Sequence, residues 1–492
     1  MRIGSAGAVV ADGEREFRGQ DDLPLAVDLD GTLTPSDTLH EGLITYVKNS
    51  PNNLHHLWPH LRAGKAVFKR SIAERTVFDP TLLPYNEELL AWLRAEKARG
   101  RRIVLISAAD RSIAEAVGAH LGLFDEVHGS LGVENLSGVR KLALIRETLG
   151  ERFVYAGDSR VDVPIFQAAE KVVLVGDVAR LETMLPPGKV IEQRFPNGSN
   201  GLRTWAKALR LGHWSKNVLV LVAPALALQT LSPWMAVQAL ILFVAMGLLA
   251  SATYIVNDLL DLAADRQHPV KKDRPFASGR ISARKGVMAG AGLVLATGVL
   301  ALFLPPAVDL MLAVYAVVTL LYSFVLKRQA FIDVFVLAML FTVRVLAGSL
   351  LLPPDVSPWL LTFSMLLFLS LAMVKRYAEL NRVVESGGRD VVARGYTARD
   401  LPLLLAAGVA SSFSAIVIFV IYLIAEQYSR DIYNQPGMLW ATMPLILMWV
   451  LRIWHLTIHG QMSEDPVVFA LKDRFSLALG ALAVAALILA WA

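Results

Sequence analysis

Residues 257–279, NDLLDLAADRQHPVKKDRPFASG, combine closely spaced acids and bases directly after a long apolar run. Asn257, Asp261 and Asp265 are four residues apart, and Asp258 lies three before Asp261, so a continuing helix would put all four on one face. Such a stack of carboxylates repels itself unless a divalent cation sits among it. Neighbouring bases suit a phosphate or diphosphate ligand of that cation. The segment predicts a metal–phosphate site rather than a solvated loop.

A second group of polar residues follows short apolar runs between residues 24 and 164. PLAVDLDGTLT (24–34) places Asp28 and Asp30 after one run, IVLISAAD (103–110) places Ser107 at the end of another, and FVYAGDSRVDVP (153–164) places Asp158 and Asp162 after a third. Lys141 lies between them in GVRKLALI (138–145). Because ligands gather at the carboxyl ends of strands in open α/β sheets, this pattern predicts a phosphate-handling site at one sheet edge.

These four motifs, in this order, resemble the haloacid dehalogenase superfamily. The resemblance implies an α/β Rossmann-like phosphatase domain over 21–200, with a small helical cap at about 37–95. It implies that Asp28 is the nucleophile that takes a phosphoryl group and that Asp30 is the general acid and base. Ser107 and Lys141 would hold phosphate oxygens, and Mg²⁺ would be held by Asp28, Asp30 (through its backbone carbonyl), Asp158 and Asp162. An alternative is a ligand-sensing regulator, against which the intact Asp28 and Asp30 argue.

The cap offers one segment polar and aromatic enough to face a substrate, HHLWPHLRAGKAVFKRSIAER at 55–75. Its histidines, His55, His56 and His60, are expected to be surface residues rather than ligands. The sequence does not define the substrate that this segment would select.

The second half of the chain is far more apolar than the first. The 492 residues are 54% hydrophobic and 18% charged, with a mean hydropathy of +0.48, which is too apolar for an ordinary soluble protein. Apolar runs of roughly 17–25 residues, the length that crosses a bilayer, dominate after residue 217. We expect an all-α polytopic membrane domain over 217–492 with about nine spans, near 217–232, 234–256, 284–304, 308–326, 331–352, 358–375, 401–425, 438–456 and 475–492.

Charge distribution predicts the orientation of these spans. Lysines and arginines concentrate in loops 257–283, 327–330, 376–400 and 457–474, which places those loops in the cytoplasm and the C-terminus outside a plasma (cell inner) membrane. Residues 201–216 mix Trp205 and Trp214 with bases and are expected to form an interfacial linker helix. Residues 1–20 resemble a disordered tail without the apolar core of a signal peptide. The absence of cysteine excludes disulfides, and the net charge of +5 does not indicate a nucleic-acid partner.

Ionisable residues within or beside the spans are functional candidates because burying a charge in a membrane is costly. Arg344 is the strongest of them, although an ion pair with Asp333 is an alternative role. Lys375 and Arg376 could simply anchor the end of a span, and Glu379, one turn later, could be their helical partner.

The membrane half resembles the UbiA superfamily of intramembrane prenyltransferases. The resemblance rests on NDLLDLAAD (257–265), RPFASG (274–279) and YSFVLKR (322–328). It implies that Asn257, Asp258, Asp261 and Asp265 hold Mg²⁺ on a diphosphate. Most members carry a second aspartate-rich motif, but this chain reads KRYAEL at 375–380. That departure, with GHWSKNVLV (212–220), DRQHPVKKDRP (265–275) and FIDVFVLA (331–338), resembles the branch that makes decaprenylphosphoryl-5-phosphoribose.

This branch transfers phosphoribose from phosphoribosyl diphosphate to a polyprenyl phosphate. Such a reaction brings together a diphosphate, a 5-phosphate and a lipid phosphate, which requires more cations and fewer carboxylates than aromatic prenylation. The residues expected to line the substrate phosphates are Lys216, Arg266, Lys271, Arg274, Lys327, Arg344, Lys375, Arg376 and Glu379. The soluble domain would then remove the 5-phosphate, giving polyprenylphosphoryl ribose for cell-wall arabinan precursors. The alternative is a prenyltransferase with an aromatic or other acceptor and an independent or regulatory phosphatase domain.

Overall fold

The chain forms two compact units in the computed structural model. The structure describes residues 23–132, 134–196, 201–227, 231–352, 356–387, 390–391, 394–428, 433–462, 465–470 and 472–491. The predicted disordered tail, 1–20, lies outside these residues. One unit comprises the chain up to residue 199 together with 266–273 and 277–283. The other comprises 200–265, 274–276 and 284–492.

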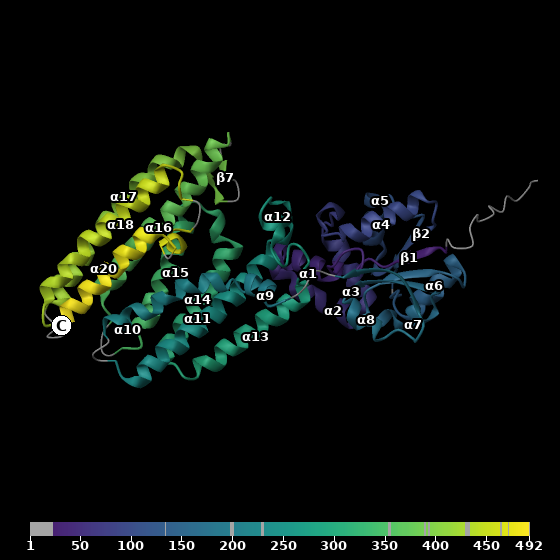
Figure 1. The fold of residues 1–492 in the computed structure, drawn as a ribbon, viewed down its shortest axis with the longest axis horizontal. Helices are drawn as coiled ribbons and strands as arrows, with labels where there is room; N and C mark the ends of the chain where they lie inside the picture. Colours follow the sequence, from purple (N-terminus) through teal and green to yellow (C-terminus); the bar gives the residue numbers. More distant parts are fainter. Residues whose placement is uncertain are drawn as a thin grey trace, which may run out of the picture. The chain divides into compact units, whose positions relative to one another are not determined.

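The first unit, which contains the strands labelled β1 and β2 in Figure 1, is built on a six-stranded parallel sheet. The strand order is β3-β2-β1-β4-β5-β6. Its strands are β1 (Leu25–Val27), β2 (Ile103–Asp110), β3 (Glu126–Ser130), β4 (Val154–Gly157), β5 (Lys171–Gly176) and β6 (Val190–Pro196). The chain order reverses on either side of β1, since β2 pairs with one edge of β1 and β4 with the other. In open α/β sheets such a reversal opens a crevice at the carboxyl ends of the strands.

Alternating side chains explain why helices cover both faces of this sheet. Leu25 and Val27 of β1 belong to one core, whereas Ala26 belongs to a second core on the opposite face. The first core includes residues of α4 (Glu87–Ala98) and α5 (Arg111–Leu121). The second includes residues of α6 (Val139–Leu149), α7 (Val163–Ala168) and α8 (Val178–Glu182). A strand buried on both faces is expected in a parallel sheet.

Between β1 and α4 lies the mostly helical cap. It contains α1 (Thr38–Asn49), η1 (Pro51–His56), α2 (Leu57–Arg62), α3 (Lys65–Arg75) and η2 (Pro80–Leu82). Tyr46, Leu57 and Ile72 form a small apolar core of its own. Leu89 and Leu93 of α4 instead join the core of the sheet, so α4 belongs to the sheet layer although the predicted cap extended to residue 95.

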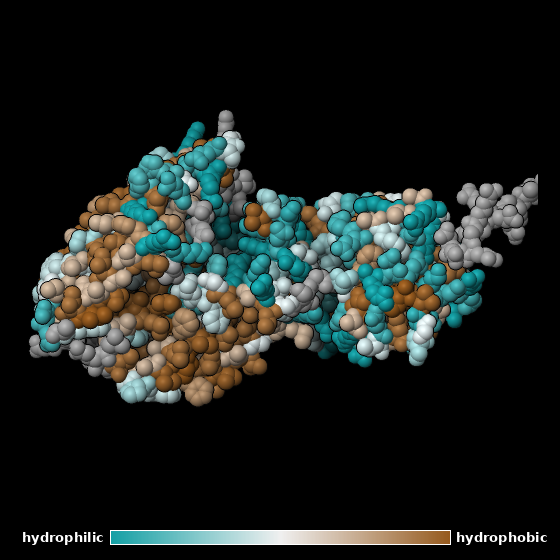
Figure 2. Space-filling model, viewed as in Figure 1, coloured by the Kyte–Doolittle hydropathy of each residue, from teal (hydrophilic) through white to brown (hydrophobic). Residues whose placement is uncertain are grey.

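The second unit is helical, as the sequence predicted. Among the described residues, eight helices are long and apolar enough to cross a membrane, with mean hydropathy between 1.2 and 2.4. They contain α11 (Pro233–Leu260), α13 (Ala283–Ala301), α14 (Pro306–Phe324), α15 (Ile332–Ser349), α16 (Pro358–Glu385), α17 (Leu401–Tyr422), α18 (Thr442–Ile458) and α20 (Arg474–Trp491). Figure 2 shows hydrophobic side chains gathered over this unit, as a lipid-facing surface requires.

The segment predicted as the first span, 217–232, differs from that prediction. After α9 (Leu202–Ala208), the chain forms a 3-10 helix, η4 (Leu211–Leu221), and then the short α10 (Val222–Leu226); residues 228–230 lie outside the described part. Pro224 has no backbone N–H with which to extend a regular helix. A Cβ at Gly348 of α15 would lie 2.0 Å from the carbonyl oxygen of Val220, so glycine permits the close packing of this segment on α15.

Candidate active sites

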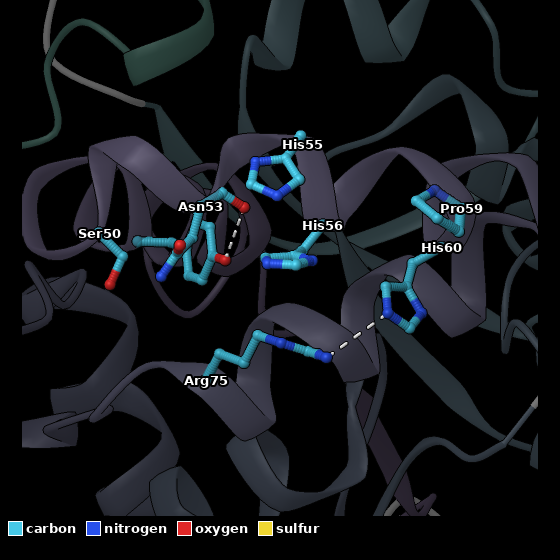
Figure 3. Close-up of a pocket in the computed structure, with 8 residues that line it drawn as sticks. Ser50, Asn53, His55, His56, Pro59, His60 and Arg75 are labelled. Atoms are coloured by element: carbon cyan, nitrogen blue, oxygen red, sulfur yellow. Dashed lines mark hydrogen bonds between the residues drawn. The ribbon is translucent and has the colours of Figure 1, made fainter.

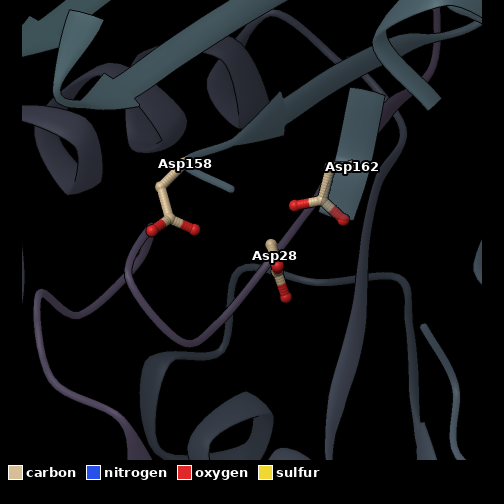
Figure 4. A group of neighbouring side chains, drawn as sticks. All are labelled: Asp28, Asp158 and Asp162. Atoms are coloured by element: carbon tan, nitrogen blue, oxygen red, sulfur yellow. The ribbon is translucent and has the colours of Figure 1, made fainter. Parts of the chain in front are cut away.

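Three carboxylates converge at the carboxyl edge of the sheet (Figure 4). Asp28 follows β1, Asp158 follows β4, and Asp162 ends the short helix η3 (Arg160–Asp162). One oxygen of each lies within 4.8 Å of the others. Gly31, with φ of +79°, makes room for this arrangement, because a Cβ there would lie 2.1 Å from Asp158 Oδ2. The topology that reverses at β1 thus brings together acids 130 residues apart in the chain.

Lys141 is the cation within this group. It is 1% exposed, and its Nζ lies 2.8 Å from Asp28 Oδ2 and 3.9 Å from Asp162 Oδ1. It also donates to the hydroxyl of Tyr155 at 2.7 Å. One lysine cannot neutralise three carboxylates, so the group retains an excess of negative charge.

Burial, together with the excess of negative charge, raises the pKa values of Asp158 and Asp162. Burial, together with the charge of Asp28, raises the pKa of Asp158 to about 8. Burial also raises the pKa of Asp162 to about 6, although Lys141 opposes the shift. Asp162 Oδ2 is buried without a hydrogen-bond partner among the described residues. Closely spaced oxygen ligands with unsatisfied charge fit Mg²⁺, a hard cation that prefers carboxylates.

Asp30 lies beside this group but not in it. Its carboxylate accepts hydrogen bonds from the backbone N–H of Thr38 at 2.9 Å and from the Thr38 hydroxyl at 3.3 Å. Burial, then the charge of Asp37, raises the pKa of Asp30 to about 7. A carboxyl group with this pKa can both give and take a proton near neutral pH. The carboxylate of Asp30 is thus placed for proton transfer, apart from the three-carboxylate group.

Ser107 is fully buried and lies within β2, three residues before its end at Asp110, rather than at the strand end as the sequence predicted. Its hydroxyl oxygen accepts the N–H of Ala109 at 3.1 Å, which leaves its hydroxyl hydrogen to be directed elsewhere. Ser107 nevertheless neighbours Asp28, since Asp28 directly follows Val27 and Ser107 lies two residues beyond Leu105, the partner of Val27.

The cap contributes a cation that the motif search did not identify. Lys69 of α3 is 7% exposed and donates to the carbonyl oxygen of Ala108, next to Ser107, and to Asn135 Oδ1 at 3.3 Å. Burial lowers the pKa of Lys69, an effect opposed by the nearby charge of Asp30. Lys69 is one of several bases in the polar segment 55–75, and helical spacing alone does not distinguish it as a site residue.

The same cap segment carries a separate hollow on the surface (Figure 3). It encloses about 760 Å³ and is lined by Tyr46, Ser50, Asn53, His55, His56, Pro59, His60 and Arg75. His60 and Arg75 approach each other at 3.5 Å, and the rings of His55 and His56 lie 4.0 Å apart. His55 and His56 are exposed and His60 is partly exposed, in line with their expected place on the surface.

In the second unit, the predicted carboxylate stack is divided between two helices. α11 ends at Leu260, Asp261 adopts φ of −98° and ψ of 12°, and α12 (Leu262–Gln267) begins after it. The expected continuous helix therefore breaks within the motif. Within the described residues, Asp258, Asp261 and Asp265 do not form a three-carboxylate group like that of the first unit.

Each of these three acids instead faces a cation. Asp258 binds Arg210 and, at 3.2 Å, Arg274. Arg274 also binds Asp265 at 2.7 Å. Lys327 lies 2.8 Å from Asp261 and 3.4 Å from the amide oxygen of Asn257. Arg274 and Lys327, two of the residues predicted to bind substrate phosphates, thus pair with carboxylates of the acidic motif.

Arg210 was missed as a site residue by the sequence reasoning. It has φ of 51° and ψ of 45°, a left-handed conformation that costs a non-glycine residue about 1–2 kcal/mol. Its guanidinium stacks 4.7 Å from the ring centroid of Tyr254 while binding Asp258. Strained backbone of this kind is concentrated at functional sites. In the sequence, Arg210 is one of several basic residues in the linker 201–216, and nothing else distinguishes it.

Arg266 and Lys271 belong to a different unit from the acidic motif. Both lie in the segment 266–273, which belongs to the first unit. Arg266 binds both oxygens of Glu41, at 2.8 and 2.6 Å, and donates to Ser36 Oγ at 3.3 Å. Lys271 is exposed at the start of η5 (Lys271–Asp273).

A second group of charges centres on Asp465, which the sequence reasoning did not single out. Asp465 Oδ2 accepts Lys216 Nζ at 2.7 Å and Lys375 Nζ at 3.2 Å. Lys216 is buried in η4, whereas the Lys375 side chain is 43% exposed, ten residues before the end of α16. Asp465 immediately precedes α19 (Pro466–Ala470), in a loop where an acid is unremarkable by sequence alone.

Arg344 does not pair with Asp333. Its Nε donates to Asn217 Oδ1 at 3.1 Å, and its other nitrogens reach the Tyr315 hydroxyl at 2.8 Å and the Leu340 carbonyl oxygen at 2.6 Å. Lys216 and Arg344 lie over the same ring, that of Phe341, at 5.4 and 5.5 Å from its centroid. These two predicted ligands are therefore close neighbours.

Arg376 and Glu379, also predicted to line the substrate phosphates, lie in a different arrangement. Arg376 is 1% exposed and binds Asp333 at 2.7 Å, while it also pairs with Glu379. The Tyr396 hydroxyl donates to Asp333 at 2.5 Å. Glu379 is thus the helical partner of Arg376, and the Asp333–Arg376 pair ties α15 to α16. This arrangement favours a structural role for the two residues, because Arg376 already pairs with two carboxylates.

Comparisons with known proteins agree with this division of the chain. The profile of the UbiA prenyltransferase family matches residues 218–480, and that of haloacid dehalogenase-like hydrolases matches 25–167. An uncharacterized protein of Sinorhizobium fredii is 40% identical over 95% of this chain and 91% of its own length. Nodulation protein NoeC of Azorhizobium caulinodans is 30% identical over 56% of this chain and 89% of its own. Decaprenyl-phosphate phosphoribosyltransferase of Mycolicibacterium smegmatis is 30% identical over 54% of this chain and 86% of its own length.

Proposed function

The chain belongs to the UbiA prenyltransferase family and also carries a haloacid dehalogenase-like domain, and we propose that it performs two successive reactions. The membrane domain transfers 5-phosphoribose from phosphoribosyl diphosphate to a polyprenyl phosphate. The soluble domain then hydrolyses the 5-phosphate to give polyprenylphosphoryl ribose, a precursor for arabinan synthesis. The similarity to decaprenyl-phosphate phosphoribosyltransferases supports the first reaction.

The observation that carries this proposal is the basic cluster, defined as Lys216, Arg344 and Lys375. The two lysines share Asp465, and Arg344 adjoins Lys216 across Phe341. A second acidic motif, which would suit a second metal on a prenyl diphosphate, is replaced here by cations. Cations are needed where the acceptor itself is a phosphate.

In the transfer, an oxygen of the polyprenyl phosphate attacks C1 of the ribose. The bond from C1 to the diphosphate oxygen breaks, and diphosphate leaves. Arg210, Arg274 and Lys327, which pair with the acidic motif, would bind diphosphate oxygens. Mg²⁺ bound by Asp258 and Asp261 would offset the charge of the leaving group. Lys216, Arg344 and Lys375 would orient the acceptor phosphate.

In the hydrolysis, Asp28 attacks the 5-phosphate and the ribose 5-oxygen leaves. Asp30, with its pKa raised to about 7, donates a proton to that oxygen. Asp30 then takes a proton from the water that attacks the phosphoaspartate, which breaks the Asp28–phosphorus bond and releases inorganic phosphate. Lys141 and Ser107 hold the phosphoryl oxygens. Mg²⁺ held by Asp28, Asp158, Asp162 and the backbone carbonyl of Asp30 would offset the repulsion between carboxylate and phosphate. Lys69 is placed for a second anionic group of the substrate, such as the phosphodiester of a lipid-linked phosphoribose.

The test of this proposal uses the purified full chain with labelled phosphoribosyl diphosphate and a short polyprenyl phosphate, in Mg²⁺, with products identified by mass spectrometry. We expect lipid-linked ribose from the wild type and lipid-linked phosphoribose from Asp28→Asn. Transfer of a prenyl group to an aromatic acceptor, without use of phosphoribosyl diphosphate, would favour the alternative prenyltransferase function. Absence of Mg²⁺-dependent phosphatase activity in the wild type would favour a regulatory soluble domain.

We also propose that the soluble domain and the substrate sites face the cytoplasm and that the C-terminus lies on the other side of the plasma membrane. The basic loops support this orientation. Eight long helices alone would return the chain to the side of the membrane on which it started. The proposed orientation therefore requires the segment of η4 and α10 to cross the membrane once more. The chain has no cysteine, so single cysteines at positions 140 and 492 can be labelled selectively. In intact cells, a membrane-impermeant maleimide should label only position 492.

A further inference from the structure

The basic cluster of Lys216, Arg344 and Lys375 has more positive charge than its surroundings neutralise. Within the described residues, Asp465 is the carboxylate that forms ion pairs with the two lysines, and both use the same oxygen. Arg344 is buried and bonds to neutral groups: the Tyr315 hydroxyl, the Asn217 amide oxygen and the Leu340 carbonyl. Among the described residues, one carboxylate thus pairs with two of the three cations, and the third has only neutral partners. Buried charge without a partner is costly, so such a cluster is stabilised by binding a further anion.

Asn217 provides an independent sign of a missing ligand. Arg344 Nε can only donate, so the Asn217 atom that faces it at 3.1 Å is the amide oxygen. Asn217 Nδ2 is therefore the other amide atom, and it is buried without a partner among the described residues, in a side chain that is 1% exposed. An unsatisfied buried donor next to excess cations fits an acceptor-rich anion such as a phosphate.

We infer that Asp465 is an internal counter-anion that holds the place of a substrate phosphate monoester between Lys216 and Lys375. When the phosphate binds, the two lysines transfer their hydrogen bonds from Asp465 Oδ2 to phosphate oxygens, and Asn217 Nδ2 gains an acceptor. Asp465 thus keeps the empty cluster stable and at the same time weakens phosphate binding by competing for the lysines. The inference rests on the proposed function, which supplies two such monoesters: the polyprenyl phosphate and the 5-phosphate of the donor.

The decisive variant is Asp465→Asn, which retains the shape of the side chain and removes its charge. Binding is measured by calorimetry on the full chain in detergent, in an Asp28→Asn background so that the phosphatase domain does not hydrolyse the ligands. Farnesyl phosphate and ribose 5-phosphate serve as probes for the two sources of the monoester, and farnesol is the uncharged control. Any binding to the soluble domain is common to all variants, so differences between them belong to the membrane domain.

We expect Asp465→Asn to tighten binding of one or both phosphates about tenfold, the scale of one charge-assisted hydrogen bond, and to leave farnesol unchanged. The probe with the larger gain identifies which phosphate the cluster holds. Asp473→Asn is the matched control, because Asp473 lies in the same inter-helix region but pairs with Arg452. Unchanged or weaker binding of both phosphates by a folded Asp465→Asn protein would overturn the inference.

Lys375→Gln keeps the inference testable if Asp465→Asn does not fold. The side chain of Lys375 is partly exposed, so its loss should be tolerated. We expect binding of the favoured phosphate to weaken about tenfold, because one of its two lysines is gone. Unchanged affinity would mean that Asp465 fixes Lys375 in a purely structural pair. Failure of the proposed function is seen separately, as phosphate binding without transfer of labelled phosphoribose.

Discussion

The two acidic clusters of this protein use the same residue types in opposite electrostatic states. In the soluble domain, Asp28, Asp158 and Asp162 surround one lysine and retain unsatisfied negative charge. In the membrane domain, Asp258, Asp261 and Asp265 are matched by Arg210, Arg274 and Lys327. The first cluster is prepared for a cation before substrate arrives. The second is already neutral, so a metal there must displace basic side chains.

This difference suggests how each site couples its metal to its substrate. A cation can enter the soluble cluster alone, since it relieves repulsion between carboxylates. In the membrane cluster, a metal and a diphosphate are expected to enter together, because the displaced Arg210, Arg274 and Lys327 can then bind the diphosphate oxygens. The predictions that follow test this contrast.

The largest effect is expected for Asp28→Asn. Loss of the nucleophile should lower hydrolysis of the 5-phosphate at least about 1000-fold, because the amide cannot take the phosphoryl group. Formation of lipid-linked phosphoribose in the membrane domain should be unchanged. Product analysis by mass spectrometry measures both at once. Equal product ratios in variant and wild type would show that the soluble domain does not hydrolyse the lipid-linked product.

A smaller but still large effect is expected for Asp258→Asn in the membrane domain. It removes the acid that binds both Arg210 and Arg274, and with it a proposed metal ligand. We expect phosphoribosyl transfer to fall about 100-fold, with phosphatase activity on p-nitrophenyl phosphate intact. Asp309→Asn is the control, since Asp309 lies in the first turn of α14, outside the acidic motif. Equal losses in both variants would indicate general damage to the fold.

The contrast also shows what the sequence could and could not predict. The motifs around Asp28 and Asp158 follow strands, and the rule that parallel strands present their carboxyl ends at one edge was sufficient to predict a shared site. The i, i+4 spacing at 257–265 likewise indicated an acidic motif, but helix periodicity did not predict the break at Asp261. Sequence spacing identifies the acidic residues of a candidate site, whereas the basic residues with which they pair depend on the fold.

Long-range pairs explain the remaining differences. Asp465 meets Lys216 across 249 residues, and Arg376 rather than Arg344 meets Asp333. No spacing rule connects such residues. The sequence therefore did not indicate Asp465 as a site residue, and it did not indicate that Arg376 pairs with Asp333. Arg210 was similarly hidden, because its role depends on a left-handed backbone that its residue type does not favour. Lys69 reaches Ala108 only because the cap folds back over the sheet edge.

The pH dependence of Mg²⁺ binding tests the unsatisfied charge of the soluble cluster. The raised pKa values of Asp158, about 8, and Asp162, about 6, mean that protons occupy these acids without metal in acidic solution. Mg²⁺ must displace those protons, so its affinity should rise with pH between about 6 and 8, by up to about tenfold per pH unit for each proton released. The Mg²⁺ concentration that gives half-maximal hydrolysis of p-nitrophenyl phosphate measures this. A requirement independent of pH would contradict the excess of negative charge.

The smallest effect is expected for Lys69, which lies at the edge of the soluble site. If its cation meets a second anionic group of the substrate, Lys69→Ala should raise KM for lipid-linked phosphoribose about tenfold, the scale of one charge-assisted hydrogen bond. Hydrolysis of p-nitrophenyl phosphate, which has no second anion, should keep its KM. Lys69→Arg should restore part of the affinity, because the guanidinium retains the charge. Equal changes with both substrates would assign Lys69 to the cap's own packing on Ala108 and Asn135. The soluble site would then recognise only the phosphoryl group, and its selectivity would have to come from elsewhere in the cap.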